Sequence, residues 1–123
     1  MGSQVSNTEY EIMKYFWETG DEFSFAELMA YFNEKEDRDW KKQTLNTFLK
    51  RLMQKGLLKC RKEGRKAYYT SQMTESEYEK RCAKEILDEN YGGKLTNFIA
   101  ALSGSMNISE EEEEELLEYI RRK

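Results

Sequence analysis

The segment from residue 39 to residue 56, DWKKQTLNTFLKRLMQKG, constrains the fold most, because it predicts a helix with one apolar face and one cationic face. Apolar side chains recur in it at intervals of three and four, which is the spacing of a single buried helical stripe. Gly56 follows where a left-handed C-terminal cap would lie. We therefore predict a helix from about residue 41 to residue 55 that packs on a core through Leu45, Phe48, Leu49, Leu52 and Met53.

The opposite face of this predicted helix carries cations, amides and hydroxyls, and no carboxylate. An exposed helix usually mixes both signs of charge, whereas a helix that enters the DNA major groove needs phosphate-binding cations and base-reading amides. We therefore predict a recognition helix that contacts double-stranded DNA. Its predicted contact residues are Lys41, Lys42, Gln43, Thr44, Asn46, Thr47 and Lys50.

Charge is divided unevenly along the 123 residues, whose formal net charge is −4. Residues 38–66 carry eleven lysines and arginines against two acids, whereas residues 72–123 carry thirteen acids against seven basic residues. A basic segment inside an acidic chain indicates a polyanionic partner for that segment alone.

Two shorter helices are predicted before the recognition helix. Each begins with a capping box, in which a serine is followed three residues later by a glutamate: Ser6 with Glu9, and Ser24 with Glu27. Three helices of this size predict a helix-turn-helix core, to which Trp40 would staple the third helix. An alternative assigns the aromatic side chains to a small-molecule pocket, but helical spacing in a small domain favours a core. The predicted stripes are Tyr10, Met13, Phe16 and Trp17, then Phe25, Leu28, Met29 and Phe32.

The segment after Gly56 changes to strand-like periodicity and predicts a β-hairpin with Gly64 in its turn. A cationic hairpin behind a third helix is typical of the wing of a winged-helix domain, which rests on the phosphate backbone beside the groove. The alternative is a solvated hairpin that only closes the core. The predicted phosphate contacts of the wing are Arg61, Lys62, Arg65 and Lys66.

Three further helices are predicted between residues 72 and 123: one opened by the capping box Thr74 to Glu77, one from about residue 95 to 102, and one capped by Ser109. The last begins with six glutamates, which suit the start of a solvated helix better than an acidic binding tail. Stripes this short do not enclose a core alone, so we expect a homodimer. Its predicted contacts are Tyr78, Ile86, Leu87, Tyr91, Leu95, Phe98, Ile99, Leu102, Leu116, Leu117 and Ile120.

These elements predict a mainly α protein with a small β-hairpin, of the α+β class. It would comprise an N-terminal winged helix-turn-helix domain, residues 1–71, and a C-terminal three-helix dimerisation domain, residues 72–123. The function predicted is that of a dimeric transcriptional repressor on a palindromic operator. The alternative is a winged-helix module that binds protein instead of DNA, which apolar or acidic residues on the exposed face of the third helix would favour.

Several classes of function are not expected. The chain has no histidine, and Cys60 and Cys82 form no CxxC motif, so we predict neither a metal site nor a cofactor. Without a nucleophile motif or a phosphate loop, no enzyme is expected. We expect a cytoplasmic protein without membrane insertion, because there is neither an apolar run of spanning length nor a signal sequence. The opening residues fit a short N-myristoylation pattern, but Ser6 serves better as a helix cap.

A series of short motifs resembles the penicillinase and methicillin-resistance repressor family (BlaI/MecI type), which also includes copper-responsive repressors. The resemblance implies a dimeric winged-helix repressor of resistance genes, released when a membrane sensor triggers its proteolytic inactivation. The motifs are Ser6-x-x-Glu9-Tyr10-Glu11-Ile12-Met13 through Trp17, Asp39-Trp40, Thr44-Leu45-x-Thr47, Arg51-Leu52-x-x-Lys55-Gly56, Glu63-Gly64-Arg65 and Tyr91-Gly92-Gly93.

The chain departs from this family in several places. Lys41 and Lys42 replace a Ser-Pro pair whose serine caps the recognition helix, and Asn46 replaces a frequent arginine. The resemblance makes Asn97 and Phe98 the candidate cleavage pair, although they lie about three residues before the family's cleavage position, which Ala100-Ala101 occupies. The cysteine-rich tail of the copper-responsive members is absent, so no copper ligands are expected.

Overall fold

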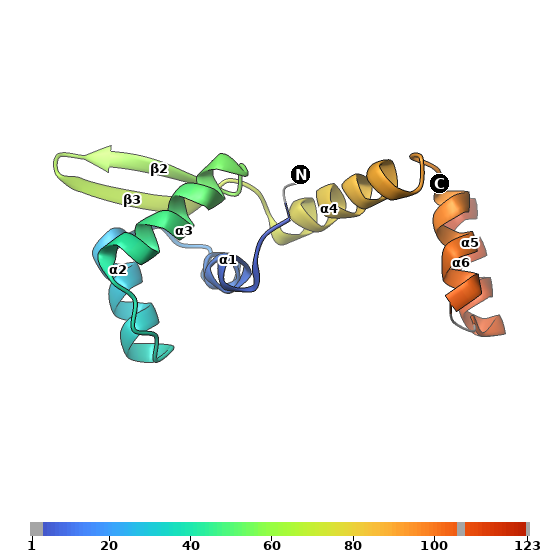
Figure 1. The fold of residues 1–123 in the computed structure, drawn as a ribbon, viewed down its shortest axis with the longest axis horizontal. Coiled ribbons are helices and arrows are strands. Elements are labelled where there is room, and N and C mark those ends of the chain that lie inside the picture. The colour runs from blue at the N-terminus through green and yellow to red at the C-terminus, as the bar shows by residue number, and fades with distance from the viewer. Residues whose placement is uncertain (1–3, 106–107, 123) are drawn as a thin grey trace. The chain divides into compact units, whose positions relative to one another are not determined.

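The computed structural model describes residues 4–105 and 108–122. It divides into two compact units, residues 1–83 and 84–123, whose helices and strands are drawn in Figure 1. The structure is mainly helical with one small antiparallel sheet, which confirms the predicted fold class. Its elements are α1 (Asn7–Thr19), β1 (Phe23–Ser24), α2 (Phe25–Ala30), η1 (Tyr31–Lys35), α3 (Lys42–Gln54), β2 (Leu58–Glu63), β3 (Lys66–Ser71), α4 (Glu75–Asn90), α5 (Leu95–Ser105) and α6 (Glu110–Arg122).

The first two helices begin at the predicted capping boxes. The Ser6 hydroxyl accepts a hydrogen bond from the Glu9 amide at 3.2 Å, and the Glu9 carboxylate accepts one from the Ser6 amide at 3.0 Å. Ser24 and Glu27 make the same pair of bonds at the start of α2. The cap of α1 at its other end is Gly20, whose φ of 70° lies in the left-handed region that glycine adopts without strain.

The loop between α2 and α3 is closed by a side chain that the sequence did not indicate. The chain leaves α2 through the π-helical turn η1, and the amide of Asn33 in this turn bonds both backbone groups of Trp40. Its Nδ2 donates to the Trp40 carbonyl at 3.0 Å, and its Oδ1 accepts from the Trp40 amide at 2.9 Å. The Trp40 ring stacks on the Phe32 ring, and its centroid lies 5.4 Å from that of the Phe48 ring of α3. Trp40 therefore links the core to α3, as predicted.

The predicted hairpin is present, and a third strand extends its sheet. Strands β2 and β3 pair antiparallel from Leu58 opposite Ser71 to Glu63 opposite Lys66, and Gly64 occupies the turn with a φ of 63°. The two-residue strand β1 pairs with the other edge of β3, giving the order β1-β3-β2. We call β2, β3 and their turn the wing; β2 contacts α3, and in Figure 1 the wing projects to the left.

A single core holds α1, α2, α3 and the sheet together. Helix α3 buries Leu45, Leu49 and Leu52 completely, with Phe48 and Met53 half-buried, so the predicted stripe is confirmed. The stripes predicted for the first two helices also face this core. Its fully or largely buried side chains are Ile12, Met13, Phe16, Leu28, Phe32, Leu45, Leu49, Leu52, Leu57, Leu58, Tyr69 and Tyr78.

Helix α4 starts within the N-terminal unit. Its predicted capping box is present. The Glu77 amide donates to Thr74 Oγ1 at 3.1 Å, and the Thr74 amide donates to the Glu77 carboxylate at 2.8 Å. Tyr78 is only 7% exposed, packs against Trp17 and accepts a hydrogen bond from the Val5 amide at 3.1 Å. Burial raises the pKa of Tyr78 to about 12. The N-terminal unit therefore extends to residue 83, and the functional boundary at 71/72 stays a prediction.

The C-terminal unit contains the end of α4 together with α5 and α6. Gly92 and Gly93 end α4 with positive φ angles, and Tyr91 contacts the Phe98 ring edge at 5.3 Å between centroids. Ser109 caps α6 as predicted, accepting from the Glu112 amide at 3.2 Å. Helix α5 continues to residue 105, three residues beyond its predicted end. Among the described helices, none combines the length and the apolar character needed to cross a membrane.

Candidate nucleic-acid interface

The predicted contact residues of α3 lie on its exposed face. Lys41, the N-cap residue, and the five predicted contacts Lys42, Gln43, Asn46, Thr47 and Lys50 are exposed, while Thr44 is half-buried. In the part of the chain that the structure describes, no carboxylate forms an ion pair with Lys41, Lys42 or Lys50. This face thus offers cations that no ion pair with a described residue neutralises.

The polar side chains of this face differ in what they can offer a base. The Thr47 hydroxyl donates to the Gln43 carbonyl at 2.9 Å, so its proton is used within the helix and only its oxygen lone pairs face outward. The side-chain amide of Asn46 is not engaged in this way among the described residues. An amide that is both donor and acceptor can make the paired hydrogen bonds that distinguish adenine in the major groove.

The C-terminal end of α3 is fixed by two charged side chains from other helices. Lys55 Nζ donates to Glu9 Oε1 at 2.8 Å, and Arg81 Nη2 donates to the Lys55 carbonyl at 2.8 Å. Burial alone would raise the pKa of Glu9, but hydrogen bonds from Lys55 and Ser6 outweigh it and hold that pKa below its usual range. These bonds position α3 against α1 and α4.

The start of α3 has no side-chain cap, as the sequence comparison of Lys41 with the family's serine predicted. The helix is held there by the bonds between Asn33 and Trp40, on the residue before the N-cap. No local pattern in the sequence identifies Asn33, because its partner lies in the loop before another helix.

The wing presents its cations unequally. Lys62, Arg65 and Lys66 are exposed around the turn, and within the described ranges none of them is in an ion pair. Arg61 differs, because its guanidinium bonds Glu22 at 2.8 and 3.2 Å and Glu63 at 3.1 Å, and lies over the Tyr68 ring. The hydrogen bond from Arg61 holds the pKa of Glu22 below its usual range. Arg61 therefore anchors the wing, and its predicted phosphate contact is the weakest of the four.

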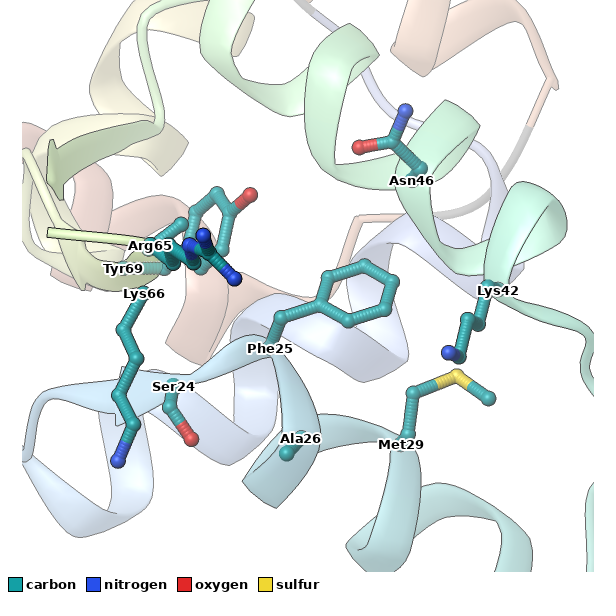
Figure 2. Close-up of a pocket in the computed structure, with 10 residues that line it drawn as sticks. Ser24, Phe25, Ala26, Met29, Lys42, Asn46, Arg65, Lys66 and Tyr69 are labelled. Carbon is teal, nitrogen blue, oxygen red and sulfur yellow. The ribbon is translucent and has the colours of Figure 1, made fainter.

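A groove of about 660 Å³ separates α2, α3 and the wing (Figure 2). We call it the wing groove. Phe25 and Met29 of α2, together with Ala67 and Tyr69 of β3, form its apolar floor. The structure thus brings cations of α3 and of the wing, which are separate in the sequence, to one opening. Its polar rim consists of Lys42, Asn46, Arg65 and Lys66.

The residues predicted for dimerisation fall into two groups. Tyr78 belongs to the core of the N-terminal unit and leaves little surface for a partner. In the C-terminal unit, Leu95, Leu117 and Ile120 are 49%, 43% and 47% exposed, which is high for large apolar side chains. The others predicted there, from α4 to α6, are Ile86, Leu87, Tyr91, Phe98, Ile99, Leu102 and Leu116, half-buried or partly exposed.

The candidate cleavage pair lies inside α5. Asn97 is exposed and its Nδ2 donates to the Tyr91 carbonyl at 3.1 Å, while Phe98 packs on the Tyr91 ring. A peptide bond within a helix is accessible to a protease only after local unfolding. Cleavage there therefore requires that these two contacts with Tyr91 open first.

Comparison with known proteins shows which family this chain resembles. The family profile described as "Penicillinase repressor" matches residues 5–122. The chain is 30% identical over 117 residues to the penicillinase repressor of Bacillus licheniformis, and this alignment covers 95% of this chain and 89% of that protein. It is 24% identical over 121 residues to the methicillin resistance regulatory protein MecI of Staphylococcus aureus, spanning 98% and 95% of the two chains.

A solved structure resembles part of this chain. The solution structure of the DNA-binding domain of the repressor BlaI is 34% identical, with a TM-score of 0.53, and the match covers 63% of this chain and 94% of that one. These relatives are named as a repressor, a resistance regulatory protein and the DNA-binding domain of a repressor, and none of them as an enzyme, which confirms the prediction that this protein is not an enzyme. The resemblance stated from the sequence motifs is confirmed as well, since the matching profile covers nearly the whole chain: this protein belongs to the penicillinase repressor family.

Proposed function

We propose that this protein is a transcriptional repressor that binds operator DNA through the exposed face of α3 and the wing. Family membership supports DNA binding and repression. The proposal depends on one observation: the exposed face of α3 carries cations and amides and no carboxylate, while its opposite face is a fully buried leucine stripe. A winged-helix module that binds protein would instead place apolar or acidic side chains there.

The geometry supports a division of labour between the contacts. Asn46 would read a base edge from the major groove, while Lys42 and Lys50 would contact phosphates on either side of it. The wing would follow the neighbouring backbone with Lys62, Arg65 and Lys66. Phosphate contacts set register and affinity, whereas the amide sets sequence preference.

Dimerisation would occur through the C-terminal unit. Leu95, Leu117 and Ile120 expose apolar surface that a second copy would cover, and a two-fold axis would pair the same surface on both subunits. Two recognition helices related by such an axis would match a palindromic operator. Because the second half-site is then bound intramolecularly, the dimer gains roughly 10² or more in affinity over one unit.

The binding proposal is tested by selecting duplexes from a random library and measuring their affinity by fluorescence anisotropy. Affinity for the selected site should fall by roughly 10³ or more between 50 and 200 mM salt, because several phosphate contacts release counterions. Asn46→Ala should cost about 1 to 3 kcal/mol on that site and little on random DNA, whereas Lys50→Gln should weaken both. Selection of no sequence, or salt-insensitive binding, would refute the proposal.

The dimer is tested by sedimentation equilibrium on the full chain. Ile120→Glu places a charge on the proposed surface and should raise the monomer fraction, whereas Lys84→Glu, at an exposed polar position of the same unit, should leave it unchanged. A wild-type chain that remains monomeric at micromolar concentration would contradict the assignment.

Release from the operator by a membrane sensor protease is the mode of regulation that the family resemblance suggests. Cleavage between Asn97 and Phe98 would separate α6 and most of α5 from the N-terminal unit, so dimerisation and operator affinity would fall together. Mass spectrometry of the fragments formed under inducing conditions tests this. An intact repressor off its operator would exclude cleavage, and a cut at Ala100-Ala101 would show that helix position is what the protease recognises.

A further inference from the structure

The wing groove differs from two other hollows of the N-terminal unit in the charge of its rim. Lys42 of α3 and Arg65 and Lys66 of the wing surround it, and its lining includes no carboxylate from residues 4–105 or 108–122. A second hollow carries Glu75 and Glu77, and a third carries Glu11, Glu18 and Glu36 with one lysine. Among these three, the wing groove is the one suited to an anion.

The floor of the wing groove is apolar and only partly covered. In Figure 2 the Phe25 ring reaches from α2 toward α3, and the Met29 side chain ends beside Lys42. Both side chains are half-buried, so each keeps surface toward the opening. A ligand that covers this surface gains about 25 cal/mol for each Å² of apolar area removed from water.

A DNA phosphate would satisfy the rim but not the floor. A phosphodiester is polar throughout, so it would pair with the lysines and the arginine and leave the Phe25 ring and the Met29 thioether uncovered. A small organic anion with an apolar body matches both parts, since its charged end pairs with the rim while its body lies on the floor. The volume of about 660 Å³ falls within the range of small-molecule sites.

We propose that the wing groove binds a small organic carboxylate with an aromatic body, and that its occupancy displaces DNA. The displacement part rests on the proposed function, because Lys42, Arg65 and Lys66 are the same cations assigned there to phosphates. A carboxylate that pairs with any one of them withdraws that cation from the operator phosphates. Ligand and DNA then compete for one surface, without any conformational change being required.

The binding part is tested on the full-length protein labelled with ¹³C at the methionine methyl groups. Indole-3-acetate is the probe, and indole-3-acetamide, which has the same ring without the charge, is the control. The acetate should shift the Met29 resonance saturably, while Met73, which lines the second hollow, should not respond. The acetamide should bind at least tenfold more weakly, because it lacks the charge that the rim recognises.

The displacement part is tested with the selected DNA site. At a concentration of acetate ten times its own dissociation constant, the apparent dissociation constant for DNA should rise about tenfold. Ala26→Phe fills the groove from an exposed position of α2 that no proposed DNA contact uses. This variant should lose the acetate response and keep the affinity for DNA, and the resonance of the fully buried Met13 reports that it remains folded.

The proposal would be overturned by an unmoved Met29 resonance, by equal affinity for acetate and acetamide, or by an unchanged acetate response in Ala26→Phe. Inorganic phosphate that moves Met29 with the affinity of the acetate would reassign the groove to the DNA backbone and overturn it too. Failure to bind any DNA would refute the proposed function and the displacement with it, while the Met29 titration would still decide whether the groove takes a carboxylate.

Discussion

The position of Tyr78 leads to the sharpest prediction, because the sequence assigned this side chain to the dimer interface and the structure buries it in the N-terminal unit. If burial within one chain is its role, Tyr78→Ala destabilises the isolated fragment 1–83, which lacks α5 and α6. If Tyr78 served mainly as a dimer contact, the same substitution would leave that fragment almost unaffected and would weaken only self-association of the full chain.

The magnitude follows from the contacts of this side chain. Tyr78 is 7% exposed, and its ring centroid lies 5.7 Å from that of Trp17. Truncating a buried aromatic residue to alanine costs about 3 to 5 kcal/mol. Tyr78→Phe removes the hydroxyl, with its hydrogen bond from the Val5 amide and its contact with Cys82, and should cost about 1 kcal/mol. A unit of this size has a free energy of unfolding of about 4 to 12 kcal/mol, so the alanine variant will be marginal.

The assay is urea unfolding of fragment 1–83, followed by tryptophan fluorescence. Both tryptophans lie in this unit, and Trp17 contacts Tyr78 directly. Leu117→Ala in the full chain is the matched control, because its side chain is 43% exposed in the other unit and should affect sedimentation but not the unfolding of the N-terminal unit. A loss below about 1 kcal/mol in Tyr78→Ala would refute the reasoning, given the usual cost of a buried aromatic truncation.

Three more predictions concern the same unit. Folding lowers the pKa of Glu9, so its ionised carboxylate adds to the free energy of unfolding above about pH 4.5, and this stabilisation is lost as the pH falls through the lowered pKa. In an acid titration, Glu9→Gln should therefore lose less stability than the wild type. Fragment 1–83 should unfold at higher urea than fragment 1–71, and equal midpoints would count against a unit that extends to residue 83. Arg81→Met leaves the Lys55 carbonyl without its donor and should cost about 1 to 2 kcal/mol in urea unfolding.

Local signals in the sequence predicted what local interactions decide. The capping boxes at Ser6, Ser24 and Thr74 each involve residues three apart, and the structure contains all of them. The stripe of α3 and the glycine turn of the wing are likewise short-range patterns, and both are confirmed. The cationic face of α3 was predictable for the same reason, since helical spacing alone separates it from the stripe.

Features that depend on distant partners could not be predicted in this way. Strand β1 has two residues and exists because β3 offers an unpaired edge, so its own sequence carries no strand signal. Arg61 was predicted to contact phosphate, but it forms ion pairs both with the neighbouring Glu63 and with Glu22, and Glu22, 39 positions away in the chain, could not be identified from local sequence. The wing groove has the same origin: Lys42 and Arg65 meet there only after folding.

The paired bonds between Asn33 and Trp40 determine how far the loop before α3 can change in length. They tie the two ends of the intervening loop together, so the start of α3 is located by the turn η1 and not by the residues between. Asp37 is exposed at the tip of this loop and already adopts a φ of 56°. Residues inserted beside Asp37 would lengthen a loop that is already closed, at an entropic cost of about 0.6 kcal/mol for each doubling of its length. Related repressors could therefore differ in loop length here and still present the third helix at the same angle, while a change at Asn33 itself would remove both bonds that locate the start of that helix.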